Sequence, residues 1–71
     1  MRKNNFAGQH RENISVGELV EIVQKHHQRT GELTEGFVGR ILTSAAFHTH
    51  GIKVKLKTGE VGRVKIISSE E

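Results

Sequence analysis

The sequence feature that most constrains the fold is the alternation of apolar and cationic residues in GIKVKLKTGEVGRVK, residues 51–65. Alternation with a period of two is typical of strands that bury one face, and the central KTG predicts a tight turn. These residues therefore predict a β-hairpin with an apolar inner face and a basic outer face.

The same residues restrict the register of the hairpin. A two-residue turn would place Val54 opposite Arg63 and carry cations into the core, so we exclude it. A three-residue turn over 57–59, ending in a left-handed glycine, pairs Val54 with Gly62 and leaves the inner face apolar. On the second strand the alternation then predicts an inner face made of Gly62, Val64 and Ile66.

The outer face of this hairpin collects like charges. Lys53 lies opposite Arg63 in the expected register, and Lys55 and Lys65 flank them diagonally. Like charges directly across a sheet cost roughly 0.2–1 kcal/mol per pair. A small domain buries only about 60% of the surface of its unfolded chain, so its stability is marginal. The arrangement therefore predicts a partner that is negatively charged.

Composition and charge agree with a small basic domain. The chain has 71 residues, a net charge of +3 and neither cysteine nor aspartate. Disulfides and cysteine-ligated zinc are excluded, which suits a reducing compartment. No apolar run approaches the roughly 20 residues of a membrane span, and the first residues lack the apolar stretch of a signal peptide. We expect a cytoplasmic protein with no membrane partner.

One folded domain is expected over residues 14–67. Residues 1–13 are polar, basic and aperiodic, which predicts a flexible N-terminal arm, and residues 68–71 predict a short tail.

Residues 14–25, ISVGELVEIVQK, carry both helix and strand signals. Ser15 followed by Glu18 matches a helix capping box. Gly17 in the first turn and several β-branched residues oppose a helix. A helical stripe is formed by Val16, Leu19, Val20 and Val23. Local rules lean slightly to helix, and the residues alone leave the choice open.

Residues 37–43, FVGRILT, predict a strand with a bulge or a close backbone approach at Gly39, between loops at 26–36 and 44–51. Segments 36–42 and 59–65 share G-x-V-G-R, either because two strands have the same bulge glycine or by coincidence between two β-edges of similar composition. We expect Phe37 in the core. Phe47 is the one aromatic residue placed to stack on a base, but a core or loop-anchoring role is favoured for it.

Several segments resemble the YwbE-like family of short, conserved, uncharacterised proteins. They are QRTGELTEGFV at 28–38, ILT at 41–43, HTHGIKV at 48–54 and GEVGRV at 59–64. The resemblance implies a mostly β fold, a small SH3-like barrel of about five strands, and on this ground we expect a strand at 19–25. It implies no activity. Acids are expected in this family at positions occupied here by His26, His27, Lys57 and Thr58.

Catalytic and metal chemistry find little support in the sequence. Without aspartate or cysteine, Ser-His-Asp and Cys-His sites are excluded in their usual forms, and Glu32 and Glu35 lie in an expected solvated loop. His48 and His50 could join His26 or His27 around zinc, but no carboxylate or thiolate completes the set. We therefore expect no enzyme, no cofactor and no metal.

The expected function is a non-enzymatic nucleic-acid-binding module whose ligand is RNA. Phosphates would meet Lys53, Lys55, Arg63 and Lys65. The patch would be extended by Lys25, Arg29 and Arg40, with His48 and His50 contacting bases or phosphates. With three phenylalanines and no Trp or Tyr, contacts with the RNA backbone are favoured over stacking platforms. The alternative is a protein–protein interaction adaptor within a larger assembly.

Overall fold

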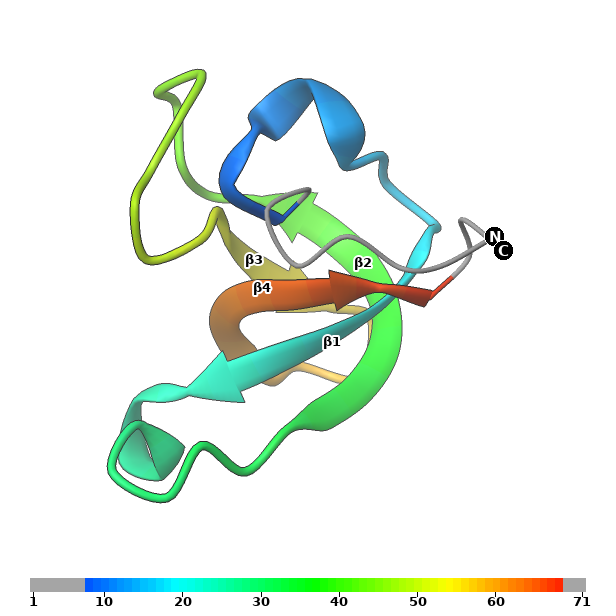
Figure 1. Cartoon of the computed structure of the whole chain (residues 1–71). Helices are drawn as coiled ribbons and strands as arrows, with labels where there is room; N and C mark the ends of the chain where they lie inside the picture. Colours follow the sequence, from blue (N-terminus) through cyan, green and yellow to red (C-terminus); the bar gives the residue numbers. More distant parts are fainter. Residues whose placement is uncertain (1–7, 69–71) are drawn as a thin grey trace.

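A four-stranded antiparallel barrel forms the body of the protein (Figure 1). The structure is a computed structural model that describes residues 8–68. Neighbouring strands pair in chain order and β4 closes the barrel against β1. The strands are β1 (Leu19–Gln24), β2 (Thr34–Ile41), β3 (Lys53–Leu56) and β4 (Val61–Ile67). This confirms the predicted mostly β, SH3-like barrel, with four strands instead of about five.

The named elements besides the strands include the short 3₁₀ turns η2 (Arg11–Asn13) and η3 (Lys25–His27). Neither is long or apolar enough to span a bilayer, and the same holds for every helix within residues 8–68.

Aliphatic side chains fill the barrel. They come from all four strands and from the segments before β1 and β3, and most are β-branched, which suits the pleated surface of a strand. The fully buried members are Val20, Ile22, Val38, Ile52, Val54, Leu56, Val64 and Ile67. Ile14, 4% exposed, joins the same cluster from the N-terminal side.

Within the ambiguous segment at 14–25, residues 19–24 form β1, as expected from the family resemblance. One of the two contacts of a helix capping box is present, because the Ser15 N–H donates to Glu18 Oε1 at 3.0 Å. It closes only a turn, in which Gly17 has a φ of +92°. The chain then becomes a strand because β1 has a partner on each side, β2 and β4. Tertiary pairing therefore overrides the local helix signal.

The hairpin of β3 and β4 has the predicted register. Lys53 pairs with Arg63, and Val54 pairs with Gly62. The Leu56 N–H donates to the Glu60 carbonyl at 2.8 Å, which leaves residues 57–59 as a three-residue turn. Gly59 has a φ of +109°, a conformation that favours glycine.

Strand β2 begins and ends earlier than the predicted 37–43. Residues 34–36, expected in a loop, pair with β1, and Thr34 Oγ1 accepts a hydrogen bond from Gln24 Nε2 at 2.9 Å. Residues 34–36 are polar or glycine, so they show no apolar alternation that would predict a strand. Backbone pairing with β1 holds them in the sheet. The bulge predicted at Gly39 is confirmed, since Val38 pairs with Leu56 while Arg40 pairs with Lys55.

The alternation of inward and outward side chains along β4 is interrupted near the end of the strand. The pairing with β1 shifts so that Val64 faces Ile22 while Ile66 faces Glu21, and Lys65 is the extra residue. Beyond this bulge Ile67 is buried, 1% exposed, and Ile66 is not in the core cluster. The prediction of Ile66 on the inner face is therefore wrong. The bulge of β4 lies at Lys65 and not at Gly62, so the shared G-x-V-G-R does not give the two strands the same bulge and coincidence is favoured.

Phe37 is not a core residue. Val38 points into the barrel and is fully buried, so its neighbour Phe37 points outward and is 53% exposed. Across the strands Phe37 lies beside Leu19.

Residues 8–13 differ from the expected flexible arm, whereas residues 1–7 of that arm and 69–71 of the expected tail lie outside the described residues. The Ile52 N–H donates to the Gly8 carbonyl at 2.8 Å, and the Arg11 N–H donates to the Ala46 carbonyl at 2.8 Å. His10 forms a β-bridge with Phe47, and their rings lie 5.0 Å apart. The segment, blue in Figure 1, therefore packs against the barrel and the 44–51 loop.

We predict that Gly62→Ala destabilises the barrel. A Cβ at this position would lie 2.5 Å from the Val23 carbonyl oxygen, so β1 and β4 would have to separate. The free energy of unfolding should fall by roughly 1–3 kcal/mol, measured by urea denaturation. Gly31→Asn is the control, because its φ of +76° suits asparagine and a Cβ there meets nothing. Equal midpoints for Gly62→Ala and the parent would contradict this close approach.

Candidate nucleic-acid interface

Two adjoining cavities form a groove over the outer face of β4. Their volumes are 430 and 250 Å³, and both are lined by Val23, Gln28 and Arg63. The first also has His50 and Lys65 in its wall, and the second has Lys25 and Lys53. We call this feature the basic groove and define it by its titratable residues Lys25, His50, Lys53, Arg63 and Lys65.

Arg63 lies at the centre of the basic groove because of its place in the barrel. Its backbone pairs with Lys53 on β3 and with Val23 on β1. Its Nη1 donates to the Gly51 carbonyl at 3.2 Å. The guanidinium is thus held at a fixed position and keeps further N–H donors for a ligand.

A tight turn over residues 48–51 brings His50 to the groove. The Gly51 N–H donates to the His48 carbonyl at 3.0 Å. Gly51 has a φ of +101°, and a Cβ there would lie 2.5 Å from the Val64 carbonyl oxygen, so the turn requires glycine. The His50 N–H donates to His48 Nδ1 at 3.1 Å, which places the two rings 5.8 Å apart.

His48 is held in its neutral form by its surroundings. Partial desolvation lowers the pKa of its imidazole, and the nearby charges of Arg63 and His50 lower it further. Its Nδ1 also accepts the hydrogen bond from His50, which requires that nitrogen to be unprotonated. His48 therefore positions the turn and does not supply a positive charge near neutral pH.

The cations of the groove have no acidic partners. Of the described residues that line the two cavities, none is a glutamate. Within residues 8–68 the observed ion pair joins His27 to Glu32 at 3.6 Å, and no lysine or arginine pairs with a glutamate. Glu60, the acid of the hairpin, accepts a hydrogen bond from Thr58, which lowers the pKa of its carboxyl group. The positive charge of the groove is thus left uncompensated.

The predicted site residues fall into two groups. Those brought together around the groove are Lys25, His50, Lys53, Arg63 and Lys65. Lys55 and Arg40 pair with each other on β3 and β2 and do not line it. Arg29 is exposed between Gln28 and Gly31, which do line it. Val23 and Gln28 were missed, because nothing in their local sequence marks them as neighbours of β4.

Four of the five histidines form two pairs in the structure. The rings of His26 and His27 lie 4.1 Å apart, and those of His48 and His50 lie 5.8 Å apart. In the described part of the chain, no three histidine or acidic side chains gather closely enough to hold a metal ion.

Removing the cation of Lys53 should stabilise the fold. Lys53 faces Arg63 directly, so we predict that Lys53→Thr raises the free energy of unfolding by about 0.2–1 kcal/mol in dilute buffer. In about 1 M salt, where charges more than about 3 Å apart are screened, the gain should vanish. Lys57→Thr, in the turn of the hairpin, removes a lysine that faces no cation and should give no gain. A gain that persists at high salt would contradict charge repulsion as its cause.

The pKa of His48 should lie below the usual value of 6.5. Because the folded value is the lower one, the unfolded chain binds the proton more readily below about pH 6.5. The contribution of His48 to stability is therefore complete above that pH and declines as the pH falls. An NMR titration of the imidazole should show the low midpoint, and Arg63→Gln should raise it. A midpoint at or above 6.5 in the parent protein would contradict the assignment.

Comparison with known proteins agrees with the sequence resemblance. Residues 7–67 match the family described as "Uncharacterized conserved protein (DUF2196)". "Uncharacterized protein YwbE" of Bacillus subtilis (strain 168) is 53% identical over 62 residues, which cover 87% of this chain and 95% of the relative. No solved structure matches the chain. The family match and the high identity over nearly the whole described region show that this chain belongs to the YwbE-like family of uncharacterised conserved proteins.

Proposed function

We propose that the protein is a non-enzymatic RNA-binding module whose basic groove holds the sugar–phosphate backbone. The observation that carries the proposal is the uncompensated positive charge of one groove. Lys25, Lys53, Arg63 and Lys65 line it and no glutamate does, although the chain contains eight glutamates. A bound phosphate would relieve the repulsion between Lys53 and Arg63.

The shape of the groove favours a linear polyanion over a small anion. Its cations are spread over two adjoining cavities and come from β3, β4 and η3. Phosphates that follow one another along a strand can meet such cations in succession. Gln28 lines both cavities, and its amide can both donate to and accept from a ribose 2′-hydroxyl, the group that distinguishes RNA from DNA.

A binding role in the cytoplasm also suits the chemistry of the side chains. The chain has no cysteine or aspartate. His48 Nδ1 is already occupied by the His50 N–H, and Glu32 faces His27. These contacts give the candidate bases structural roles. The absence of cysteine is compatible with a reducing compartment.

A protein–protein interaction adaptor is the second candidate function, and the exposure of Phe37 is what favours it. Phe37 is 53% exposed beside Leu19 on the β1–β2 pair. Exposed aromatic side chains are frequent anchors at protein interfaces. Recovery of one stoichiometric protein partner, together with no RNA binding at low salt, would favour this function.

The test of RNA binding is a salt titration of affinity for a short single-stranded RNA. With about three phosphate contacts, the logarithm of the association constant should fall with a slope of about −2 against the logarithm of salt concentration. Replacing Lys53, Arg63 and Lys65 by glutamine should remove most of this slope, measured by fluorescence anisotropy. A DNA strand of the same sequence should bind more weakly.

The matched control replaces Arg40, Lys55 and Lys57 by glutamine. This variant loses the same charge from the β2–β3 side of the barrel and leaves the lining of the groove intact. It should keep most of the affinity and slope of the parent. Equal losses in both triple variants would show that net charge, and not the groove, attracts RNA.

A further inference from the structure

A third cavity continues the basic groove at its His50 end and differs from it in chemistry. It has a volume of 370 Å³, within the range of about 300–1,000 Å³ found for small-molecule sites. His50 and Lys65 line both this cavity and the adjoining cavity of the groove. The other residues of its lining are Gln9, Leu33, Gly51, Val64 and Ile66. We call it the end cavity.

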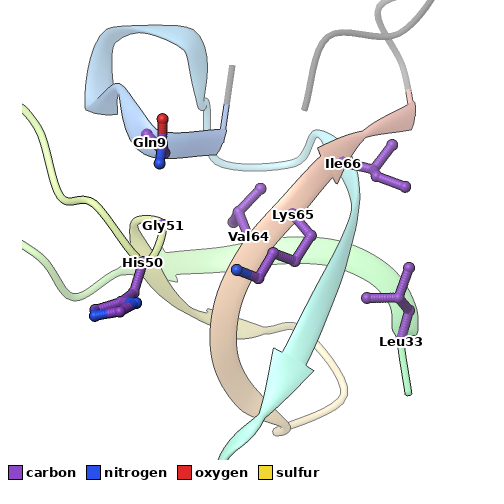
Figure 2. Close-up of a pocket in the computed structure, with 7 residues that line it drawn as sticks. All are labelled: Gln9, Leu33, His50, Gly51, Val64, Lys65 and Ile66. Atoms are coloured by element: carbon purple, nitrogen blue, oxygen red, sulfur yellow. The ribbon is translucent and has the colours of Figure 1, made fainter. Parts of the chain in front are cut away.

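The end cavity combines an apolar wall with polar groups. In Figure 2 the Lys65 side chain points toward His50, with Leu33 and Ile66 on its other side. Leu33 is 38% exposed just before β2, and Ile66 is turned out of the core by the bulge at Lys65. Gln9 Nε2 donates to the Thr49 carbonyl at 2.6 Å, which fixes the amide at the rim and leaves its oxygen as an acceptor.

We propose that the end cavity takes one unpaired nucleobase of the RNA whose phosphates occupy the basic groove. A base has apolar faces and polar edges, which match aliphatic Leu33 and Ile66, the imidazole of His50 and the amide of Gln9. A phosphate alone would gain nothing from the aliphatic wall, and a base inside a duplex could not enter. The inference rests on the proposed function and restricts its ligand to RNA with unpaired bases.

The end cavity is a better base site than the exposed Phe37. It shares two residues with the groove, so a base and its own phosphate can be bound together. Phe37 lies on β2 beside Leu19 and lines none of the three cavities.

The experiment compares a short oligouridylate with an abasic strand of the same length. The two probes carry the same phosphates and differ only in their bases. The parent protein should bind the oligouridylate about tenfold more tightly, and Leu33→Ser should remove this preference. Binding of the abasic strand and its salt dependence should not change in Leu33→Ser. Leu42→Ser is the matched control, since Leu42 is 41% exposed and lies outside the cavity, and it should keep the preference.

The possible failures are distinguishable. Equal affinity of the parent for both strands would overturn the base site and leave the phosphate groove standing. A preference that survives in Leu33→Ser would overturn the assignment of the base to the end cavity. Absence of binding to either strand at low salt would overturn the proposed function and this inference with it.

Discussion

The register of the β3–β4 hairpin is the constraint on which the rest of the structure depends. The three-residue turn ending in left-handed Gly59 sets the pairing of Val54 with Gly62. In that register every inward side chain of β3 is aliphatic and every outward one is lysine. A shift by one residue would bury the cations and expose the aliphatic residues, so the core and the basic surface are fixed by the same turn. Gly62 then lets β4 approach β1 closely enough to close the barrel.

Like charges face each other across two pairs of strands. Lys53 faces Arg63 across β3 and β4, while Glu21 faces Glu35 across β1 and β2. Opposite charges placed across the strands would stabilise the sheet, whereas like charges weaken it. The like-charged pair of the groove, Lys53 and Arg63, and the like-charged acidic pair, Glu21 and Glu35, therefore lie on different pairs of strands.

Much of the hairpin was predictable because its determinants are local. Alternation and turn chemistry fixed the partners of Lys53 and Val54 without reference to any other segment. The strand at β1 needed the family resemblance, since the turn at Ser15 and Glu18 satisfies a helix signal without starting a helix. Phe37 was misplaced because Phe37 and Val38 are adjacent apolar residues of one strand, only one of which can face the core, and the structure buries Val38.

The site was predictable only in part, because it joins distant segments. Gln9, Leu33 and His50 line one cavity although more than fifteen positions separate each from the next in the sequence. The position of Gln9 follows from backbone hydrogen bonds between residues 8–11 and residues 46–52, and such bonds leave no trace in composition or periodicity. Local rules could therefore find the cations of the hairpin, but not the cavity beside them.

The bulge at Lys65 connects the fold to the proposed ligand. Regular alternation would have placed Ile66 in the core, and Ile67 would then have pointed outward. The extra residue reverses both: Ile67 fills the core, Ile66 lines the end cavity, and Lys65 lies between that cavity and the basic groove. The isoleucine pair lets the strand lose one core side chain and regain another of the same size. The bulge changes the core little, because one isoleucine takes the place of the other. A small barrel can therefore form a binding site at such a bulge.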